Sequence, residues 1–377
     1  MNRYLVILVF IALAPNAHAQ DITPEMTEYI RKAQDPAAYL IDKFKTYDVI
    51  FLAEHHLIRQ NLLFVQDMIP KLYKAGVYTV AMEFGAAEVQ DKLDALITGK
   101  VYDEKAARDI MFTYNVTWGY QEYLDVYRAA WRWNQSLPAG ARRFRILNLS
   151  YVFHWDKYDG QRTIEGMSKV FDKGTVDKYR ADRIEQEILS KGEKVLALVG
   201  TPHAYTRYGS PYYKYNGDNF CDFDRNWLGN RVYRKSPGRV YSVMLHQAFT
   251  IKQGNMYSAV SPGGGLVEKL MATNNNRAVG FDLLNSPAGK IPDRSLYAVC
   301  YPDFTLEQLF DGYNFLKPLR ELEGCTPIPE FVNETNIAHA ISNFPDPDWH
   351  EKIINLEEMR KFIINNPKQA VRDYKGL

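Results

Sequence analysis

Glutamate and histidine side chains stand at the ends of three short apolar runs that lie far apart in the sequence. In chain order they are Glu54, His55 and His56 after the run 49–52, Glu83 after the run 77–82, and His203 after the run 195–199. A carboxylate beside a histidine fixes the imidazole tautomer and stabilises its protonated form, so the pair can take a proton from water or give one to a leaving group. The residue types therefore indicate acid–base chemistry.

These residues can act together only if the runs bring them to one place. Each run is short and apolar and precedes a helical pattern, which predicts a buried strand of a parallel sheet. Carboxyl ends of parallel strands meet at one edge, where sites form. Further strands and helices are expected at 144–149, 240–245, 278–282 and 313–316, and at 58–75 and 180–189. The alternation predicts an α/β fold with a central parallel-rich sheet flanked by helices.

Within that site, His56 is expected to be the general base, with Glu83 or Glu54 as its orienting partner. His203 is expected to be the acid or the electrophilic stabiliser. Alternation along an extended segment sends His55 to the opposite side from His56. The set of His56, Glu83 and His203 could also hold a divalent metal. The sequence contains no Gly-x-Ser-x-Gly motif, so a serine hydrolase of the common α/β type has no support.

Other candidates are secondary. His154 and His246 follow further strand-like runs and could lie at the rim of the site. Arg59 follows His56 by one helical turn, where it could bind a substrate carboxylate, but a solvated helix face is the favoured interpretation. No role is assigned to the remaining histidines of the C-terminal region.

The chain is expected to form a single domain over residues 20–377. A helical insertion at about 86–138 is rich in aromatic residues, and packing within a small core is its favoured role. The Tyr- and Asn-rich tract 210–236 has no clear periodicity and predicts a long loop that acts as a lid or contacts substrate. A helical extension is expected at about 330–377.

The first 19 residues resemble a secretory signal peptide. They begin with one basic residue, continue with an apolar stretch too short to span a bilayer, and end in Ala17-His18-Ala19, which predicts cleavage between Ala19 and Gln20. We therefore expect a periplasmic or secreted protein without a stable membrane anchor. Cleavage would remove Arg3 and change the formal net charge of the protein from +1 to 0. A neutral protein has no overall positive field that would attract nucleic acid.

The chain has three cysteines, Cys221, Cys300 and Cys325. Export would permit one disulfide and one free thiol, and Cys300 and Cys325 are the nearest pair in sequence, but spacing does not decide the pairing. The absence of a C-x-x-C motif argues against a zinc ribbon and excludes covalent c-type haem attachment.

Three motifs together resemble the haem-binding uptake and Tiki-like superfamily, which includes ChaN-like haem-binding proteins and erythromycin esterases. They are Ala53-Glu54-His55-His56, Met82-Glu83 and Gly200-Thr201-Pro202-His203, and the resemblance spans about residues 40–325. The family pattern usually has Gly at the position of Ala53. The helix 180–188, with Asp182 near its start, also resembles the esterase segment before the last histidine strand. The resemblance implies Glu54, His56, Glu83 and His203 as the site.

Two functions follow from this resemblance. The esterases imply hydrolysis of an ester or amide-like bond in a small-molecule substrate. The Tiki-like relatives imply that a divalent metal assists this hydrolysis. The ChaN-like proteins imply haem binding, for which His203, Tyr205 and Tyr208 are candidate axial ligands and the aromatic segment 114–133 a candidate wall. Hydrolysis is the favoured expectation, and haem or metal binding is the alternative.

Overall fold

The structure is a computed structural model and describes residues 21–377. The predicted signal peptide, residues 1–19, and its cleavage site at Ala19 lie outside the described residues.

Seven strands form the central sheet, in the order β10-β11-β7-β1-β4-β2-β3. They are β1 (Val49–Glu54), β2 (Thr79–Ala86), β3 (Arg145–Ser150), β4 (Val195–Gly200), β7 (Val240–Leu245), β10 (Val279–Asp282) and β11 (Gly312–Phe315). All pair in parallel except β10, which runs antiparallel to β11. The predicted α/β class with a parallel-rich sheet is confirmed.

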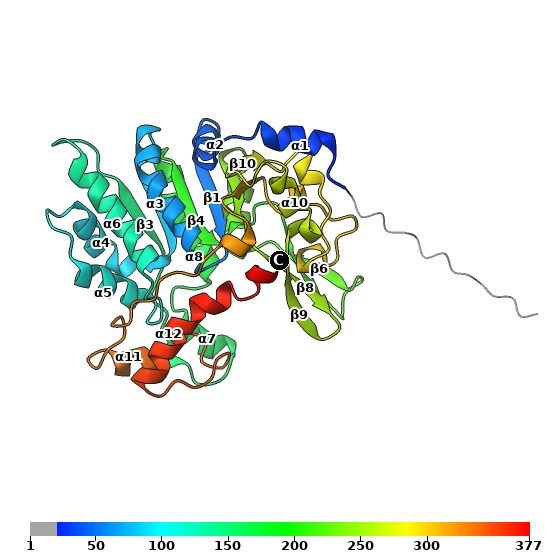
Figure 1. The fold of residues 1–377 in the computed structure, drawn as a ribbon. Helices are drawn as coiled ribbons and strands as arrows, with labels where there is room; N and C mark the ends of the chain where they lie inside the picture. Colours follow the sequence, from blue (N-terminus) through cyan, green and yellow to red (C-terminus); the bar gives the residue numbers. More distant parts are fainter. Residues whose placement is uncertain (1–20) are drawn as a thin grey trace, which may run out of the picture.

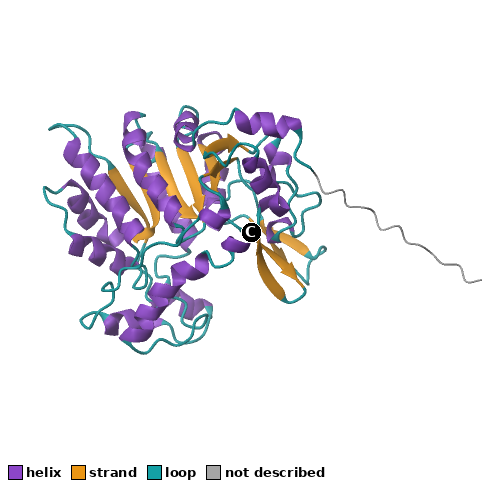
Figure 2. Cartoon of the chain, in the orientation of Figure 1, coloured by secondary structure: helices purple, strands orange, loops and turns teal. Residues whose placement is uncertain are grey.

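Twelve α-helices accompany these strands in the described part of the chain (Figures 1 and 2). They are α1 (Pro24–Arg31), α2 (Pro36–Lys43), α3 (Arg59–Lys74), α4 (Gln90–Thr98), α5 (Glu104–Tyr114), α6 (Gln121–Ser136), α7 (Ile164–Val170), α8 (Val176–Glu187), α9 (Leu228–Lys235), α10 (Leu266–Ala272), α11 (Ile337–Ser342) and α12 (Leu356–Ala370). Burial of both sheet faces explains why β1 is apolar at successive positions: Ile50 and Leu52 belong to one hydrophobic cluster, and Phe51 and Ala53 belong to the other.

The aromatic-rich helices α4 to α6 pack into the hydrophobic core on one face of the sheet. Tyr120, Tyr123 and Tyr127 are fully buried there, in the same hydrophobic cluster as the α3 residues Leu62 and Val65. Large rings that bury fully on one helix face supply much of the packing area of such a layer. Core packing therefore accounts for most of the aromatic residues in this segment.

Two small hairpins lie outside the main sheet. They are β5 (Ser210–Tyr213) with β6 (Cys221–Asp224), and β8 (Phe249–Gln253) with β9 (Met256–Val260). The prediction of one long loop over 210–236 is therefore wrong, because this tract forms the first hairpin and then α9. Its strands are short and pair only with each other, so they leave a weak periodic signal in the sequence.

A disulfide ties the first hairpin to the body of the protein. Cys221 in β6 is bonded to Cys300, with 5.8 Å between the Cα atoms and 79 residues between them in sequence. Cys325 is a buried free thiol. One disulfide and one free cysteine were expected, but the bonded pair is not the nearest pair in sequence.

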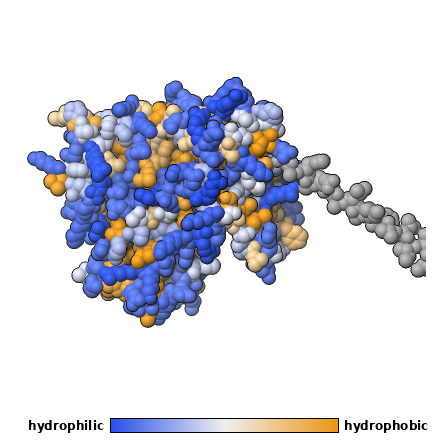
Figure 3. Space-filling view, in the orientation of Figure 1, coloured by the Kyte–Doolittle hydropathy of each residue, from blue (hydrophilic) through white to orange (hydrophobic). Residues whose placement is uncertain are grey.

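The face of the molecule seen in Figure 3 is mostly hydrophilic, with apolar groups scattered over it and some gathered at the lower right, where Figure 1 draws β8 and β9. None of the described helices combines the length and the apolar character that crossing a membrane requires.

Candidate active site

The sheet order explains how distant residues meet. Strand β4 lies between β1 and β2, and Glu54 at the end of β1 is in register with Gly200 at the end of β4. Glu83 lies on β2, on the other side of β4. The four predicted residues Glu54, His56, Glu83 and His203 are therefore brought together at the carboxyl edge.

Glu83 is the centre of the site. It is 6% exposed and lies where the register of β2 against β3 shifts, between Met82 and Ala86. Its Oε1 atom lies 3.3 Å from Nε2 of His203 and 3.2 Å from Nη2 of Arg180. Its Oε2 atom accepts a hydrogen bond of 2.7 Å from the backbone N–H of Gly200 and lies 3.9 Å from Nε2 of His56. Glu83 therefore faces both histidines.

The surroundings keep Glu83 ionised. Burial alone would raise the pKa of its carboxyl group, but the positive charges of His203 and Arg180 outweigh burial and hold this pKa well below its usual value. The Gly200 N–H further favours the carboxylate. Glu83 is thus a fixed negative charge between the two histidine rings.

His56 is held by a second carboxylate. Its Nδ1 atom lies 3.1 Å from Oε1 of Glu54, which also accepts a hydrogen bond of 2.9 Å from the Tyr123 hydroxyl. A neutral His56 that donates Nδ1–H to Glu54 has its Nε2 lone pair directed toward Glu83. The His56 side chain is 33% exposed, and its ring is perpendicular to that of Phe84 at a centroid distance of 4.9 Å. His56 can therefore receive a proton from a molecule at the surface of the site.

The pKa of His56 is raised. Burial lowers it, but the hydrogen bond to Glu54 and the negative charge of Glu83 outweigh burial. The same two carboxylates would stabilise the imidazolium that forms when His56 takes up a proton.

His203 lies on the short 3₁₀ turn Thr201–Ala204 that follows β4. Its Nδ1 atom lies 2.6 Å from Oδ1 of Asp177. Burial lowers the pKa of His203, but attraction by Glu83 and the hydrogen bond to Asp177 raise it to about 9. His203 is therefore an imidazolium at neutral pH, and it can donate a proton.

Two residues of α8, Asp177 and Arg180, were not predicted. They are three positions apart and so share one helix face. Arg180 is 2% exposed, and besides Glu83 it contacts the Ser150 hydroxyl at 2.9 Å and the Tyr114 hydroxyl at 3.3 Å. One signal in the sequence could have led to Arg180, because a buried carboxylate such as Glu83 requires a cationic partner.

Asp182, which was noted in the resemblance to the esterases, does not contact the site residues. It lies 2.6 Å from Lys178 and 3.7 Å from Lys235 in partly exposed ion pairs.

His55 and Arg59 also lie outside the site. The Nδ1 atom of His55 lies 3.2 Å from the Tyr374 hydroxyl, and burial lowers the pKa of His55 to about 4. Arg59 forms ion pairs with Glu122 at 3.2 Å and with Glu323 at 3.3 Å. The expected divergence of His55 from His56 agrees with these contacts.

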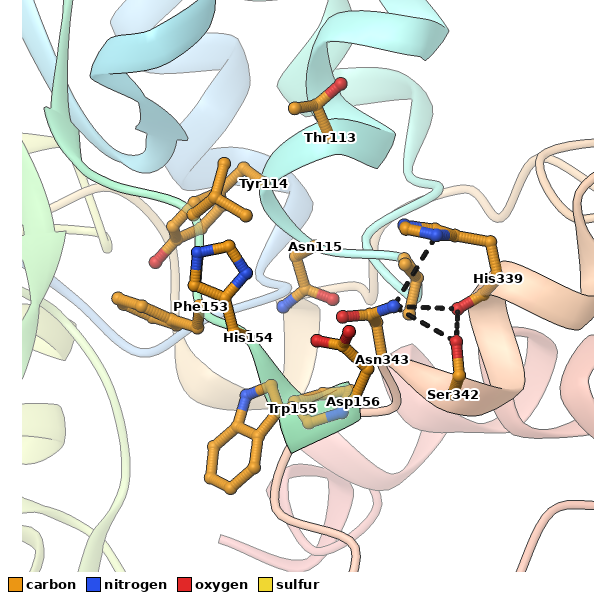
Figure 4. A pocket seen from close by; sticks show the side chains of 13 residues that line it. Thr113, Tyr114, Asn115, Phe153, His154, Trp155, Asp156, His339, Ser342 and Asn343 are labelled. Carbon is orange, nitrogen blue, oxygen red and sulfur yellow. Dashed lines mark hydrogen bonds between the residues drawn. The ribbon is translucent and has the colours of Figure 1, made fainter. Parts of the chain in front are cut away.

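His154 lines a different cavity, of about 270 Å³ (Figure 4). Its ring is 32% exposed and lies 3.6 Å from Asp172. Tyr114 and Asn343 line the same cavity, and Asn343 is hydrogen-bonded to Ser342 and to His339. Tyr114 connects this cavity to the site through its contact with Arg180 and through the packing of its ring on Phe84, at a centroid distance of 5.8 Å.

His246 is a buried structural residue. Its Nδ1 atom lies 2.6 Å from the Tyr313 hydroxyl, and its Nε2 atom lies 2.8 Å from Glu268. Both ring nitrogens therefore have partners within the core, and His246 is not part of the site.

Tyr205 and Tyr208 do not present their hydroxyls as haem ligands. They are 3% and 2% exposed and lie in a hydrophobic cluster with Phe304 and Phe310. The Tyr208 hydroxyl donates a hydrogen bond of 2.8 Å to the carbonyl of Tyr297. Their buried rings therefore do not provide the tyrosine oxygen that could serve as an axial haem ligand.

The residues also do not fit a divalent metal. Within residues 21–377, no group of three or more His, Cys, Asp and Glu side chains is arranged to hold a metal ion. The Arg180 guanidinium occupies Oε1 of Glu83, and Asp177 occupies Nδ1 of His203. A cation beside Arg180 would meet like charge, so ion pairs take the place of metal bonds here.

No model of a known protein family matches the sequence, and no curated protein matches it. Among solved structures, the chain is similar to a succinoglycan biosynthesis protein, with a TM-score of 0.49 and 10% identity over 77% of this chain and 95% of that one. A protein from Bacillus cereus is similar with a TM-score of 0.42 and 9% identity, over 77% and 96% of the two chains.

The haem-binding ChaN of Campylobacter jejuni is similar with a TM-score of 0.36 and 15% identity, over 58% of this chain and 86% of that one. Bacterial protein toxins also match, and the chain spans 41% and 40% of the length of two of them. These likenesses assign no activity to this chain.

Proposed function

We propose that the protein is a hydrolase that cleaves an ester or amide-like bond with a pair of histidines. The observation that carries this proposal is that each histidine has its own carboxylate at Nδ1, Glu54 for His56 and Asp177 for His203, while both Nε2 atoms face Glu83. Such an arrangement separates a base from an acid at one site.

In the first step, His56 acts as the general base. A water molecule beside Nε2 of His56 loses a proton to that nitrogen as its oxygen forms a bond to the carbonyl carbon of the substrate. Glu54 stabilises the imidazolium that forms, through the hydrogen bond at Nδ1. Glu83, which lies 3.9 Å from the same nitrogen, adds a second negative charge.

In the second step, His203 acts as the general acid. The tetrahedral intermediate collapses, the bond from carbon to the leaving oxygen or nitrogen breaks, and the leaving atom takes the proton from Nε2 of His203. Asp177 keeps Nδ1–H in place throughout. His56 then releases its proton to solvent and His203 recovers one, which completes the cycle without change in charge.

We also propose that the protein works in the periplasm or outside the cell. The Cys221–Cys300 disulfide supports this proposal, because disulfides persist in oxidising compartments. It agrees with the signal peptide that the sequence predicts over residues 1–19.

The test is hydrolysis of a panel of nitrophenyl esters, lactones and aryl amides by residues 20–377. His56→Ala and His203→Ala should each lower kcat/KM by about 100- to 10,000-fold, the range of a general base or acid. His154→Ala is the matched control, since its ring is exposed to 32% against 33% for His56, and it should retain wild-type rates. Equal rates in all variants would refute the proposal.

A haemin titration followed at the Soret band addresses the alternative. One-to-one binding that His203→Ala abolishes, together with no hydrolysis of any panel member, would favour a haem carrier over a hydrolase.

A further inference from the structure

An open groove lies beside the His203 side of the site. We call it the Trp227 groove; its lining is Ser210, Pro211, Tyr212, Phe223, Asp224, Asn226 and Trp227. Its volume is about 470 Å³, which lies within the range of small-molecule sites. The β5–β6 hairpin and the segment that leads into α9 form its walls.

The groove is joined to the reacting groups at one end. The Trp227 ring meets the ring of His203 edge-on, at a centroid distance of 5.5 Å. The next residue, Leu228, donates its backbone N–H at 3.1 Å to the same Asp177 oxygen that holds His203. A substrate whose scissile bond lies at His203 would therefore extend over Trp227 into the groove.

The hairpin that walls the groove is tied down. Besides the Cys221–Cys300 disulfide, the Tyr301 hydroxyl donates a hydrogen bond of 2.7 Å to the carbonyl of Gly209, and the ring of Tyr301 packs at 4.8 Å from that of Phe223. These contacts make the hairpin a fixed wall rather than the lid that the sequence suggested. A fixed wall loses little conformational entropy when a ligand binds.

The groove offers an aromatic face to solvent. Tyr212 is 47% exposed, and its hydroxyl donates a hydrogen bond of 2.9 Å to Asp222, which leaves the ring as the surface that a ligand meets. Aromatic ring faces carry partial negative charge, so they attract the weakly positive C–H groups of a sugar ring.

The polar groups around this ring suit hydroxyl groups. Asn226 supplies an amide and Asp224 a carboxylate, one oxygen of which accepts a hydrogen bond of 2.8 Å from the backbone N–H of Asn226. The lining residues of the described groove include no lysine or arginine, and the neighbouring Arg225 guanidinium is stacked over the ring of Phe223, at 5.3 Å from the ring centroid. Rings with neutral and acidic acceptors indicate an uncharged, hydroxyl-rich ligand.

We propose that the Trp227 groove binds a neutral oligosaccharide, so that the substrate is a sugar carrying an ester or amide-linked acyl group. This inference rests on the proposed hydrolase function, because it assigns the substrate class of that site. Tyr212 is the stacking platform, and Asp224 and Asn226 bind sugar hydroxyls.

The test measures binding apart from catalysis. His56→Ala of residues 20–377 is applied to an array of neutral and N-acetylated oligosaccharides, and the strongest ligand is titrated by calorimetry. Adding Tyr212→Ala should weaken binding at least tenfold, and adding Asn226→Ala several-fold. Tyr215→Ala is the matched control, since this tyrosine is 84% exposed on the same hairpin but does not line the groove, and it should change affinity less than twofold.

The outcomes separate the two proposals. Absence of oligosaccharide binding, or binding that Tyr212→Ala does not weaken, overturns the groove assignment even if nitrophenyl esters are hydrolysed in a His56-dependent manner. Groove-dependent oligosaccharide binding without hydrolysis of any ester or amide by the wild type would uphold the groove and refute the hydrolase. Preferential binding of peptides on a parallel array would also overturn the sugar assignment.

Discussion

Gly200 lies directly against the ring of His56. A methyl group on Gly200 would come to 2.6 Å from Nε2 of His56 and 3.2 Å from Oε2 of Glu83. The same residue donates its backbone N–H to Glu83. The end of β4 therefore leaves room for the proposed catalytic nitrogen and also fixes the carboxylate that faces it.

Gly200→Ala should lower kcat/KM for ester hydrolysis at least tenfold, because the added methyl group displaces the His56 ring. The fold should survive, as judged by circular dichroism. Gly238→Ala is the control, since a Cβ atom at Gly238 meets nothing within 4 Å. If both variants hydrolyse esters at the wild-type rate, the position of His56 does not matter to the reaction.

The folded state should become less stable between pH 6.5 and 9. The pKa of His203 is raised from 6.5 to about 9, so its imidazolium contributes stability below pH 6.5 that is lost as the pH rises through 9. Urea unfolding across this range should show the decline in the wild type and a shallower decline in His203→Ala. Titration of the His203 ring by NMR should give a pKa near 9, and Asp177→Asn should lower it; a value near 6.5 in both would contradict the ion pair.

Arg180→Met should lower the free energy of unfolding by up to about 3–5 kcal/mol, because it removes one of the two cations that compensate the buried charge of Glu83 and leaves only His203. The control is Lys178→Ala on the same helix, where the lysine side chain is 64% exposed and its ion pair is worth about 1 kcal/mol or less. The double variant Arg180→Met with Glu83→Gln should recover part of the loss in urea unfolding. A double variant no more stable than Arg180→Met would argue against charge as the cause.

Removing the disulfide by Cys221→Ser with Cys300→Ser should lower the free energy of unfolding by about 2–4 kcal/mol, since the bond closes a long loop. Dithiothreitol should shift the wild-type urea midpoint in the same direction and leave the double variant unchanged. A wild-type midpoint that is insensitive to reduction would mean that the hairpin is held by its packing on Tyr301 alone.

The sequence predicted the part of the site that strands position. Glu54, Glu83 and His203 each follow or end a short apolar run, and parallel strands deliver such residues to one edge whatever their separation in the chain. The alternation of strand and helix was likewise sufficient for the fold class.

The two residues that a helix face supplies were missed, and the disulfide pairing and the orientation of Tyr205 were not predicted either. The direction in which α8 presents Asp177 and Arg180 depends on how that helix docks on the sheet, which periodicity does not specify for a helix with many charged residues. The partner of Cys221 depends on where the β5–β6 hairpin lies, and that hairpin pairs only with itself. Tyr205 follows His203 by two residues, but its ring lies in the core because the backbone leaves the strand after Gly200.

The pH dependence of kcat/KM for the best ester in the panel tests the central assignment most directly. We predict a bell-shaped profile with an acid limb from His56 and an alkaline limb near pH 9 from His203, and Asp177→Asn should move the alkaline limb to lower pH. His154→Ala should leave both limbs in place. A rate that rises steadily with hydroxide through pH 9, or an alkaline limb that persists in His203→Ala, would contradict the assignment of His203 as the acid.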